Sequence, residues 1–197
     1  MAYDKFTVLK STAVPMPIEN VDTDQIIPAR FLKATERKGF GDNLFRDWRF
    51  EGDGTPKKDF VLNNPIYTGK ILVGGKNFGS GSSREHAAWA IYDYGFRCVV
   101  SSFFADIFKN NSLNIGILPV QVSESFLDQI FKAIEANPKT ELEVNLAEQK
   151  ISIVGGASES FEINGYKKHN MMNGFDDIDF LQSLKSDIQS FAVNSIY

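Results

Sequence analysis

The chain has 197 residues, of which 43% are hydrophobic, so it can bury one sizeable core but is too short for two ordinary domains. Its formal net charge is -4 and its 21 Lys and Arg residues are scattered, which argues against a basic nucleic-acid-binding face. A single cysteine, Cys98, excludes an intramolecular disulfide and cannot alone hold zinc or an iron–sulfur cluster.

Hydropathy gives no sign of a membrane protein. No stretch approaches the roughly 18 consecutive apolar residues that a membrane-spanning helix needs. Residues 1–10 also lack the apolar run of a secretory signal peptide. We therefore expect a cytoplasmic protein that binds neither nucleic acid nor membranes.

The first 65 residues show no regular pattern. Prolines separate short apolar pieces such as residues 6–9; they stand at positions 15, 17, 28, 56 and 65. Long irregular segments inside a compact protein are usually functional or disordered. We expect residues 1–197 to form one domain with an irregular N-terminal segment, about residues 1–65.

From Lys70 onward, strands and helices alternate. Ile71–Val73 predicts a buried strand, a glycine-rich loop follows, and a helix is expected over Glu85–Tyr94, ended by Gly95. The later predicted elements are a strand at 97–100, a helix at 103–111, a strand at 117–120, a helix at 125–136, antiparallel strands at 142–146, 151–154 and 161–163, and a helix at 177–184. This order indicates an α/β fold.

The loop between the first predicted strand and helix is the most informative segment. Residues 74–87 read GGKNFGSGSSREHA. Glycines let backbone N–H groups approach a ligand, a helix N-terminus carries unpaired donors, and the planar fork of Arg84 matches a carboxylate or phosphate. An anionic small molecule is the ligand that this combination suits.

Known loop templates do not match this segment. No Gly-Lys-Ser/Thr sequence closes the loop, so it is not a nucleotide-binding P-loop. It is not a dinucleotide-binding fingerprint either, because Arg84 stands where the third glycine of that motif belongs. A Gly-x-Ser-x-Gly elbow is absent as well, so an independent serine hydrolase is a poor interpretation. Ser82 and Glu85 have the spacing of a capping box, which would give the segment a structural role. A cap needs one hydroxyl and one acid, so the further Ser83 and Arg84 favour ligand binding.

Residues 77–87 resemble the signature of the small, swivelling domain of the aconitase superfamily. Four further strings accompany it in the same order, at 20–28, 45–50, 102–108 and 169–174. Together they resemble the small-subunit family of bacterial 3-isopropylmalate dehydratases over nearly the whole chain. The resemblance implies an aconitase-like swivelling β/β/α domain, with a mixed sheet flanked by helices.

The resemblance also implies a reaction. Enzymes of this family are hydro-lyases of leucine biosynthesis that interconvert 2-isopropylmalate and 3-isopropylmalate by dehydration and rehydration. Their [4Fe-4S] cluster belongs to a separate large subunit and polarises the departing hydroxyl. The resemblance therefore implies a cluster-bearing large subunit as partner, a small dicarboxylate substrate, and no cofactor or metal on this chain. Cys98, in an apolar strand, is expected to be a core residue.

Site residues follow from the resemblance position by position. Ser82 falls on the serine that abstracts the proton, and Ser83 and Arg84 on contacts to a substrate carboxylate. Arg37, in the polar stretch Lys33–Asp42, is a further carboxylate contact in a loop that helps to select the substrate. The residues expected to support the glycine loop are Gly79, Gly81, Glu85 and His86.

Ser82 cannot act as a base unaided. Ionising even a hydroxyl of pKa about 10 at pH 7 requires about 4 kcal/mol, and a helix N-terminus supplies at most about 2 kcal/mol. Other cationic groups in a water-excluded site must supply the rest. We therefore expect the chain alone to have no dehydratase activity.

Other interpretations remain open at this point. The same architecture serves a small subunit of a homoaconitase or of a methylmalate/citraconate dehydratase, and a stand-alone module that binds small anions without catalysis fits the loop as well. Asp22 and Asp24 suggest a metal pair by their spacing, but no further acids with hard-cation spacing follow. A turn that uses Asp22 or Thr23 is the expectation there.

Overall fold

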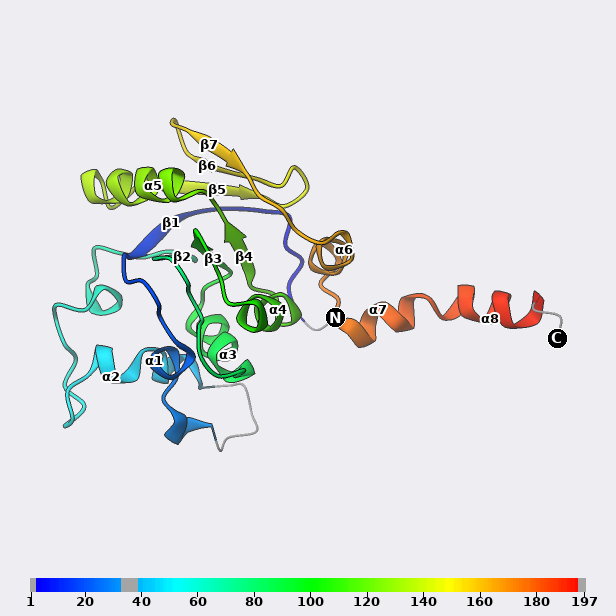
Figure 1. Ribbon diagram of the computed structural model, residues 1–197, viewed down its shortest axis with the longest axis horizontal. Helices are drawn as coiled ribbons and strands as arrows, with labels where there is room; N and C mark the ends of the chain where they lie inside the picture. Colours follow the sequence, from blue (N-terminus) through cyan, green and yellow to red (C-terminus); the bar gives the residue numbers. More distant parts are fainter. Residues whose placement is uncertain (1–2, 33–38, 195–197) are drawn as a thin grey trace.

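A seven-stranded mixed sheet organises the computed structural model, which describes residues 3–32 and 39–194 (Figure 1). In spatial order its strands are β4 (Leu118–Gln121), β3 (Cys98–Ser101), β2 (Ile71–Gly74), β1 (Val8–Met16), β5 (Glu141–Asn145), β6 (Lys150–Ile153) and β7 (Ser158–Ser160). β1 to β4 pair in parallel, and β5 to β7 extend the sheet from β1 in antiparallel pairs. The expected α/β fold with a mixed sheet is confirmed.

Helices cover both faces of this sheet (Figure 1). On one face, α5 (Glu124–Ala136) and α6 (Gly165–Asn173) pack over Ile71 and Val73. On the other, α1 (Thr23–Ile26), α3 (Glu85–Tyr94) and α4 (Asp106–Asn114) share a core with Leu72. The two cores exist because successive strand residues point to opposite faces. Phe126, Leu127, Ile130 and Ile134 of α5 are buried, as the helical spacing predicts.

The remaining elements are short or peripheral. They are η1 (Ala29–Phe31), η2 (Gly41–Asn43), α2 (Arg46–Arg49), η3 (Val61–Asn63), α7 (Asp177–Ser183) and α8 (Lys185–Asn194). Figure 1 shows α8 extending away from the sheet beyond α7. Within the described ranges, no helix combines the length and apolarity that crossing a bilayer requires.

The longest strand, β1, lies in the segment for which the sequence shows no regular pattern. β1 pairs with β5 through residues 8–12 and with β2 through residues 13–16. Gly75 N donates to Met16 O, so the backbone of Pro15 faces the opposite side, where pairing with β5 has already ended. The missing N–H of Pro15 therefore breaks no ladder. The prediction of an irregular N-terminal segment is wrong for β1.

Other predicted bounds shift for local reasons. The helix expected at 103–111 begins at Asp106, because Phe104 forms a parallel bridge with Phe78. The third antiparallel strand is Ser158–Ser160 and not 161–163. By contrast, Glu85–Tyr94 is helical as predicted, and Gly95 caps it with φ +118°.

Gly69 allows a close backbone approach between β1 and the residue pair that precedes β2. Its φ is +128°, and a Cβ atom there would lie 2.0 Å from Thr12 O. Gly95 has a similar φ of +118°, but a Cβ atom there would meet nothing within 4 Å, so it is a matched control. We predict that Gly95→Ala lowers the free energy of unfolding by about 1–2 kcal/mol. Gly69→Ala should lower it by at least about 1 kcal/mol more, because the clash adds to the conformational strain.

Urea unfolding followed by circular dichroism measures both variants. If Gly69→Ala and Gly95→Ala lowered the free energy of unfolding equally, the clash of a Cβ atom with Thr12 O would add no cost, and the prediction would be wrong.

Candidate active site

The glycine loop, residues 75–84, connects the carboxyl end of β2 to α3 and is held on both sides by backbone hydrogen bonds. Towards β1, Gly79 N and Ser80 N donate to Val21 O at 2.7 and 3.1 Å. Towards β3, Phe78 N donates to Phe103 O at 3.0 Å. The loop is thus fixed between the chain segments that leave the two strands neighbouring β2. Ligands of parallel α/β sheets bind at this kind of edge.

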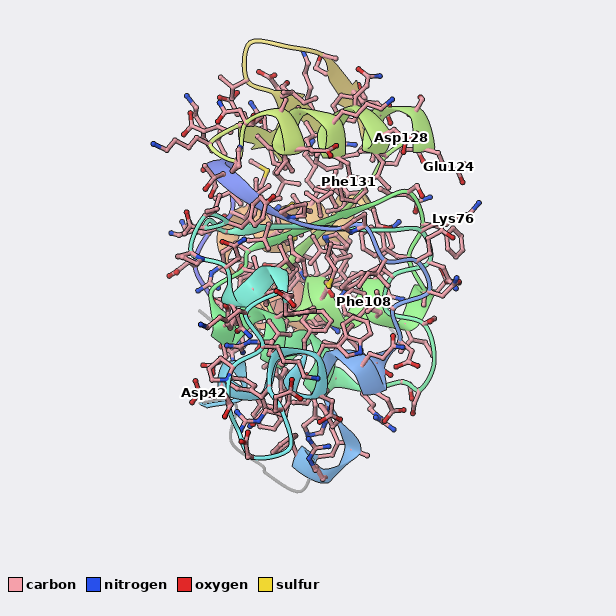
Figure 2. The ribbon with its side chains drawn as sticks, turned by 90° about the vertical axis from the view of Figure 1, so that its left-hand side faces the viewer. Asp42, Lys76, Phe108, Glu124, Asp128 and Phe131 are labelled. Atoms are coloured by element: carbon pink, nitrogen blue, oxygen red, sulfur yellow. The ribbon has the colours of Figure 1, made fainter. Side chains whose placement is uncertain are left out.

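Two glycines give the loop its path. Gly79 has a φ of +79°, and a Cβ atom there would lie 2.2 Å from Cγ of Phe108, a core residue of α4 labelled in Figure 2. Gly81 has a φ of +90°, but a Cβ atom there would meet nothing nearer than Asp22 Cβ at 3.4 Å. Both conformation and space require glycine at position 79, whereas conformation alone favours it at position 81.

Ser82, Ser83 and Arg84 stand directly before α3. Both serines are exposed, and Arg84 is the N-cap residue, with its backbone N–H donating to Ser82 O at 2.8 Å. The alternative interpretation of Ser82 and Glu85 as a capping box is therefore wrong, since α3 begins two residues later than such a cap requires. Neither serine hydroxyl forms a hydrogen bond with another described residue. Both hydroxyls are thus available to a ligand at the helix N-terminus.

The Arg84 guanidinium is held by α1. Its Nη1 donates to Asp24 Oδ1 in an ion pair, and the arginine side chain is 18% exposed. Thr23 Oγ1 of the same short helix donates to Ser82 O at 2.9 Å. α1 therefore positions both the serine segment and the guanidinium. Asp24 could not be predicted from the sequence as the partner of Arg84, because the two residues stand 60 positions apart and leave no local signal.

The start of α1 explains the pair of aspartates seen in the sequence. Asp22 is its N-cap: Asp22 Oδ1 accepts from Gln25 N at 2.7 Å, and Asp22 N donates to Gln25 Oε1 at 2.8 Å. These two bonds form a capping box. The turn expected at Asp22 is confirmed.

His86 and Glu85 support the first turn of α3 through side-chain contacts. The His86 ring lies against Trp89 and Phe40, with ring centroids 4.5 and 5.5 Å apart. Trp89 Nε1 donates to Glu85 Oε1 at 3.2 Å. The imidazole therefore belongs to an aromatic cluster beside the loop.

The segment that begins at Gly39 is hydrogen-bonded to the C-terminal end of α3. Asp93 Oδ2 accepts from Gly39 N at 2.9 Å and from Gly41 N at 2.8 Å. These bonds and the contact of Phe40 with His86 place this segment along α3. Arg37 itself lies outside the described residues.

An iron–sulfur cluster does not fit the described part of this chain. Cys98 is fully buried in β3, and burial raises the pKa of its thiol, so that it stays protonated. Clusters are held by several thiolates. Among the described residues, no three His, Cys, Asp or Glu side chains are grouped to hold a metal ion.

Two family models match adjoining stretches of the chain. Residues 3–125 match the family model described as the aconitase C-terminal domain, and residues 128–165 match the one described as LeuD_N. The first of these matches contains the whole glycine loop and α1.

Relatives resemble the chain over almost its full length. It is 65% identical over 195 residues to a 3-isopropylmalate dehydratase small subunit from Cytophaga hutchinsonii, covering 98% of this chain and 97% of the relative. A protein of the same name from Christiangramia forsetii is 60% identical over 189 residues, covering 95% of this chain and 92% of the relative.

A solved structure has the same fold. The crystal structure of 3-isopropylmalate dehydratase from Methanocaldococcus jannaschii superposes with a TM-score of 0.67 at 25% identity. The match covers 93% of this chain and 98% of the archaeal one. The resemblance seen in the sequence is thereby confirmed: the chain belongs to the family of 3-isopropylmalate dehydratase small subunits, within the aconitase superfamily.

Proposed function

We propose that this chain is the small subunit of a cytoplasmic hydro-lyase that interconverts 2-isopropylmalate and 3-isopropylmalate, and that it is active only with its large subunit. Relatives that are 65% and 60% identical to this chain carry that enzyme's name. The observation that carries the proposal is the placement of two exposed serines and Arg84 at the N-terminus of α3. We further propose that the 197 residues act as one swivelling domain, since one sheet connects them.

Arg84 and Ser83 bind a carboxylate of the substrate. The guanidinium already uses Nη1 for Asp24, which leaves its other N–H groups for a carboxylate. The partial positive charge at the start of α3 favours the same anion. We also propose Arg37 as a further cation for the substrate; the support is that Phe40, three residues later, packs against His86 in the first turn of α3.

Ser82 moves the proton. Its Oγ, as the alkoxide, takes a proton from the carbon next to a carboxylate, and the electron pair left behind forms the double bond of isopropylmaleate as hydroxide leaves the adjacent carbon. Return of the proton from Ser82 to one carbon and of hydroxide to the other, with the two carbons exchanged, gives the isomer and regenerates the alkoxide. Arg84, two residues away, and the helix N-terminus lower the free energy of the alkoxide.

We place the [4Fe-4S] cluster on the large subunit, because the described residues of this chain offer no set of ligands for it. When bound there, the cluster supplies Lewis-acid assistance to departure of the hydroxyl. This chain contributes the proton-transfer group and the carboxylate contacts, and the two halves enclose the substrate.

Replacing Ser82 tests the proposal most simply. In the complex with the large subunit, Ser82→Ala should lower kcat by at least about a hundredfold, since a general base contributes about 10²–10⁴. Ser80→Ala is the matched control, because the hydrogen bonds of Ser80 with Val21 and Thr23 use its backbone. It should keep kcat within about twofold of wild type. Retention of full rate by Ser82→Ala in an isomerase assay would rule out the assigned base.

Substitutions of Arg84 test its contact with the substrate carboxylate separately. Arg84→Gln should lower kcat/KM by about 10- to 100-fold, the effect of losing a hydrogen bond between charged groups. Arg84→Lys keeps the charge but loses the fork, so it should restore only part of the loss. Steady-state kinetics of the two complexes measures this difference. Equal kcat/KM for wild type and Arg84→Gln would remove Arg84 from the substrate site.

A further inference from the structure

The side chain of Asp93, in the last turn of α3, holds residues 39–41, which we call the stem. A single carboxylate oxygen, Oδ2, accepts from Gly39 N at 2.9 Å and from Gly41 N at 2.8 Å. On the other side of the stem, Arg49 Nη1 donates to Gly41 O at 3.4 Å. The backbone of the stem is therefore bound by side chains from both directions.

The stem also packs directly on α3. A Cβ atom at Gly41 would lie 2.5 Å from Tyr94 N, so the two backbones are in close contact there. Phe40 is 3% exposed, and its ring centroid lies 5.5 Å from that of His86 and 5.7 Å from that of Trp89. The stem thus contacts the last turn of α3 through its backbone and the first turn through the ring of Phe40.

The position of Gly39 limits the reach of the chain that precedes it. Arg37 stands two positions before Gly39, and two residues span at most about 7 Å. Along α3, Asp93 lies about 12 Å from Glu85, at 1.5 Å per residue. Only a long side chain can bridge the remaining distance to the start of the helix. Displacement of Gly39 away from α3 would therefore take Arg37 out of reach of the serines.

We propose that Asp93 is a positioning residue for the substrate site. Through the N–H groups of Gly39 and Gly41, its carboxylate holds the chain that carries Arg37 within reach of the start of α3. The proposal rests on the proposed function, in which Arg37 contacts a substrate carboxylate. Asp93 itself acts at a distance from the substrate, because it stands in the last turn of α3 and the serines precede the first.

Steady-state kinetics of the complex with the large subunit tests this role. Asp93→Ala removes the acceptor of both bonds, so it should raise KM for isopropylmalate about three- to tenfold, with kcat within about twofold of wild type. The rise should not exceed that of Arg37→Gln, through which it acts. In the Arg37→Gln background, Asp93→Ala should have no further effect on KM. Asp93→Asn keeps an oxygen with two lone pairs and should restore KM to near the wild-type value.

Asn164→Ala is the matched control. Asn164 Oδ1 also accepts from two backbone N–H groups, those of Tyr166 at 2.9 Å and Lys167 at 3.4 Å. These bonds lie at the start of α6, which packs on the opposite face of the sheet from α3. Asn164→Ala should lower the midpoint of thermal unfolding about as much as Asp93→Ala and leave KM unchanged.

Hydrogen exchange of the full chain tests the bonds of the stem without catalysis. In Asp93→Ala, the amides of Gly39 and Gly41 should exchange at least about tenfold faster than in wild type, because their acceptor is gone. The amides of Tyr166 and Lys167 should exchange as in wild type. Unchanged exchange at Gly39 and Gly41 would overturn the proposal.

The kinetic outcomes separate this proposal from the proposed function. If Arg37→Gln raises KM but Asp93→Ala matches Asn164→Ala, or if the effects of Arg37→Gln and Asp93→Ala add in the double variant, Asp93 does not position Arg37 and the proposed function stands. If Arg37→Gln leaves KM unchanged, the substrate contact assigned to Arg37 is wrong, and the positioning role of Asp93 fails with it.

Discussion

Backbone hydrogen bonds between the glycine loop and the chain that leaves β1 are the constraint on which the site depends. Val21 O accepts two N–H groups of the loop, and Thr23 N donates to Ser80 O at 2.9 Å. These bonds carry the parallel pairing of β1 and β2 beyond the end of the sheet, so α1 arrives directly beside the start of α3. Side chains from segments far apart in sequence meet there because the backbone brings them together.

The ion pair between Asp24 and Arg84 orients the guanidinium more than it stabilises the fold. Asp24 is more than half exposed, and such pairs contribute about 1 kcal/mol or less to stability. A cation at a helix N-terminus is also unfavourable by itself, because it faces the positive end of the dipole. Asp24 offsets this repulsion and fixes the guanidinium. In the proposed mechanism, a substrate carboxylate then meets a cation whose position is already set.

Much of this architecture could be predicted from the sequence, and the exceptions have physical causes. The helix 85–94 and its cap at Gly95 are local features, so spacing and a C-terminal glycine suffice to find them. β1 was not predicted because Pro15 is a residue type that interrupts strands. Only the sheet shows that the backbone of Pro15 faces a side of β1 where no strand is paired. Ser82 and Glu85 have the residue types and spacing of a capping box, but Ser82 lies outside α3, where its carbonyl accepts a hydrogen bond from Thr23 of α1. The role of Asp24 depends wholly on tertiary structure.

The central claim is that this chain holds half of an active site. Its most direct test is to titrate the purified large subunit with this chain under anaerobic conditions while following the interconversion of the two isopropylmalates. Each protein alone should be inactive, and the rate should rise with added chain until the sites are saturated. Turnover by the isolated chain, or a rate that does not change on adding it, would contradict the claim.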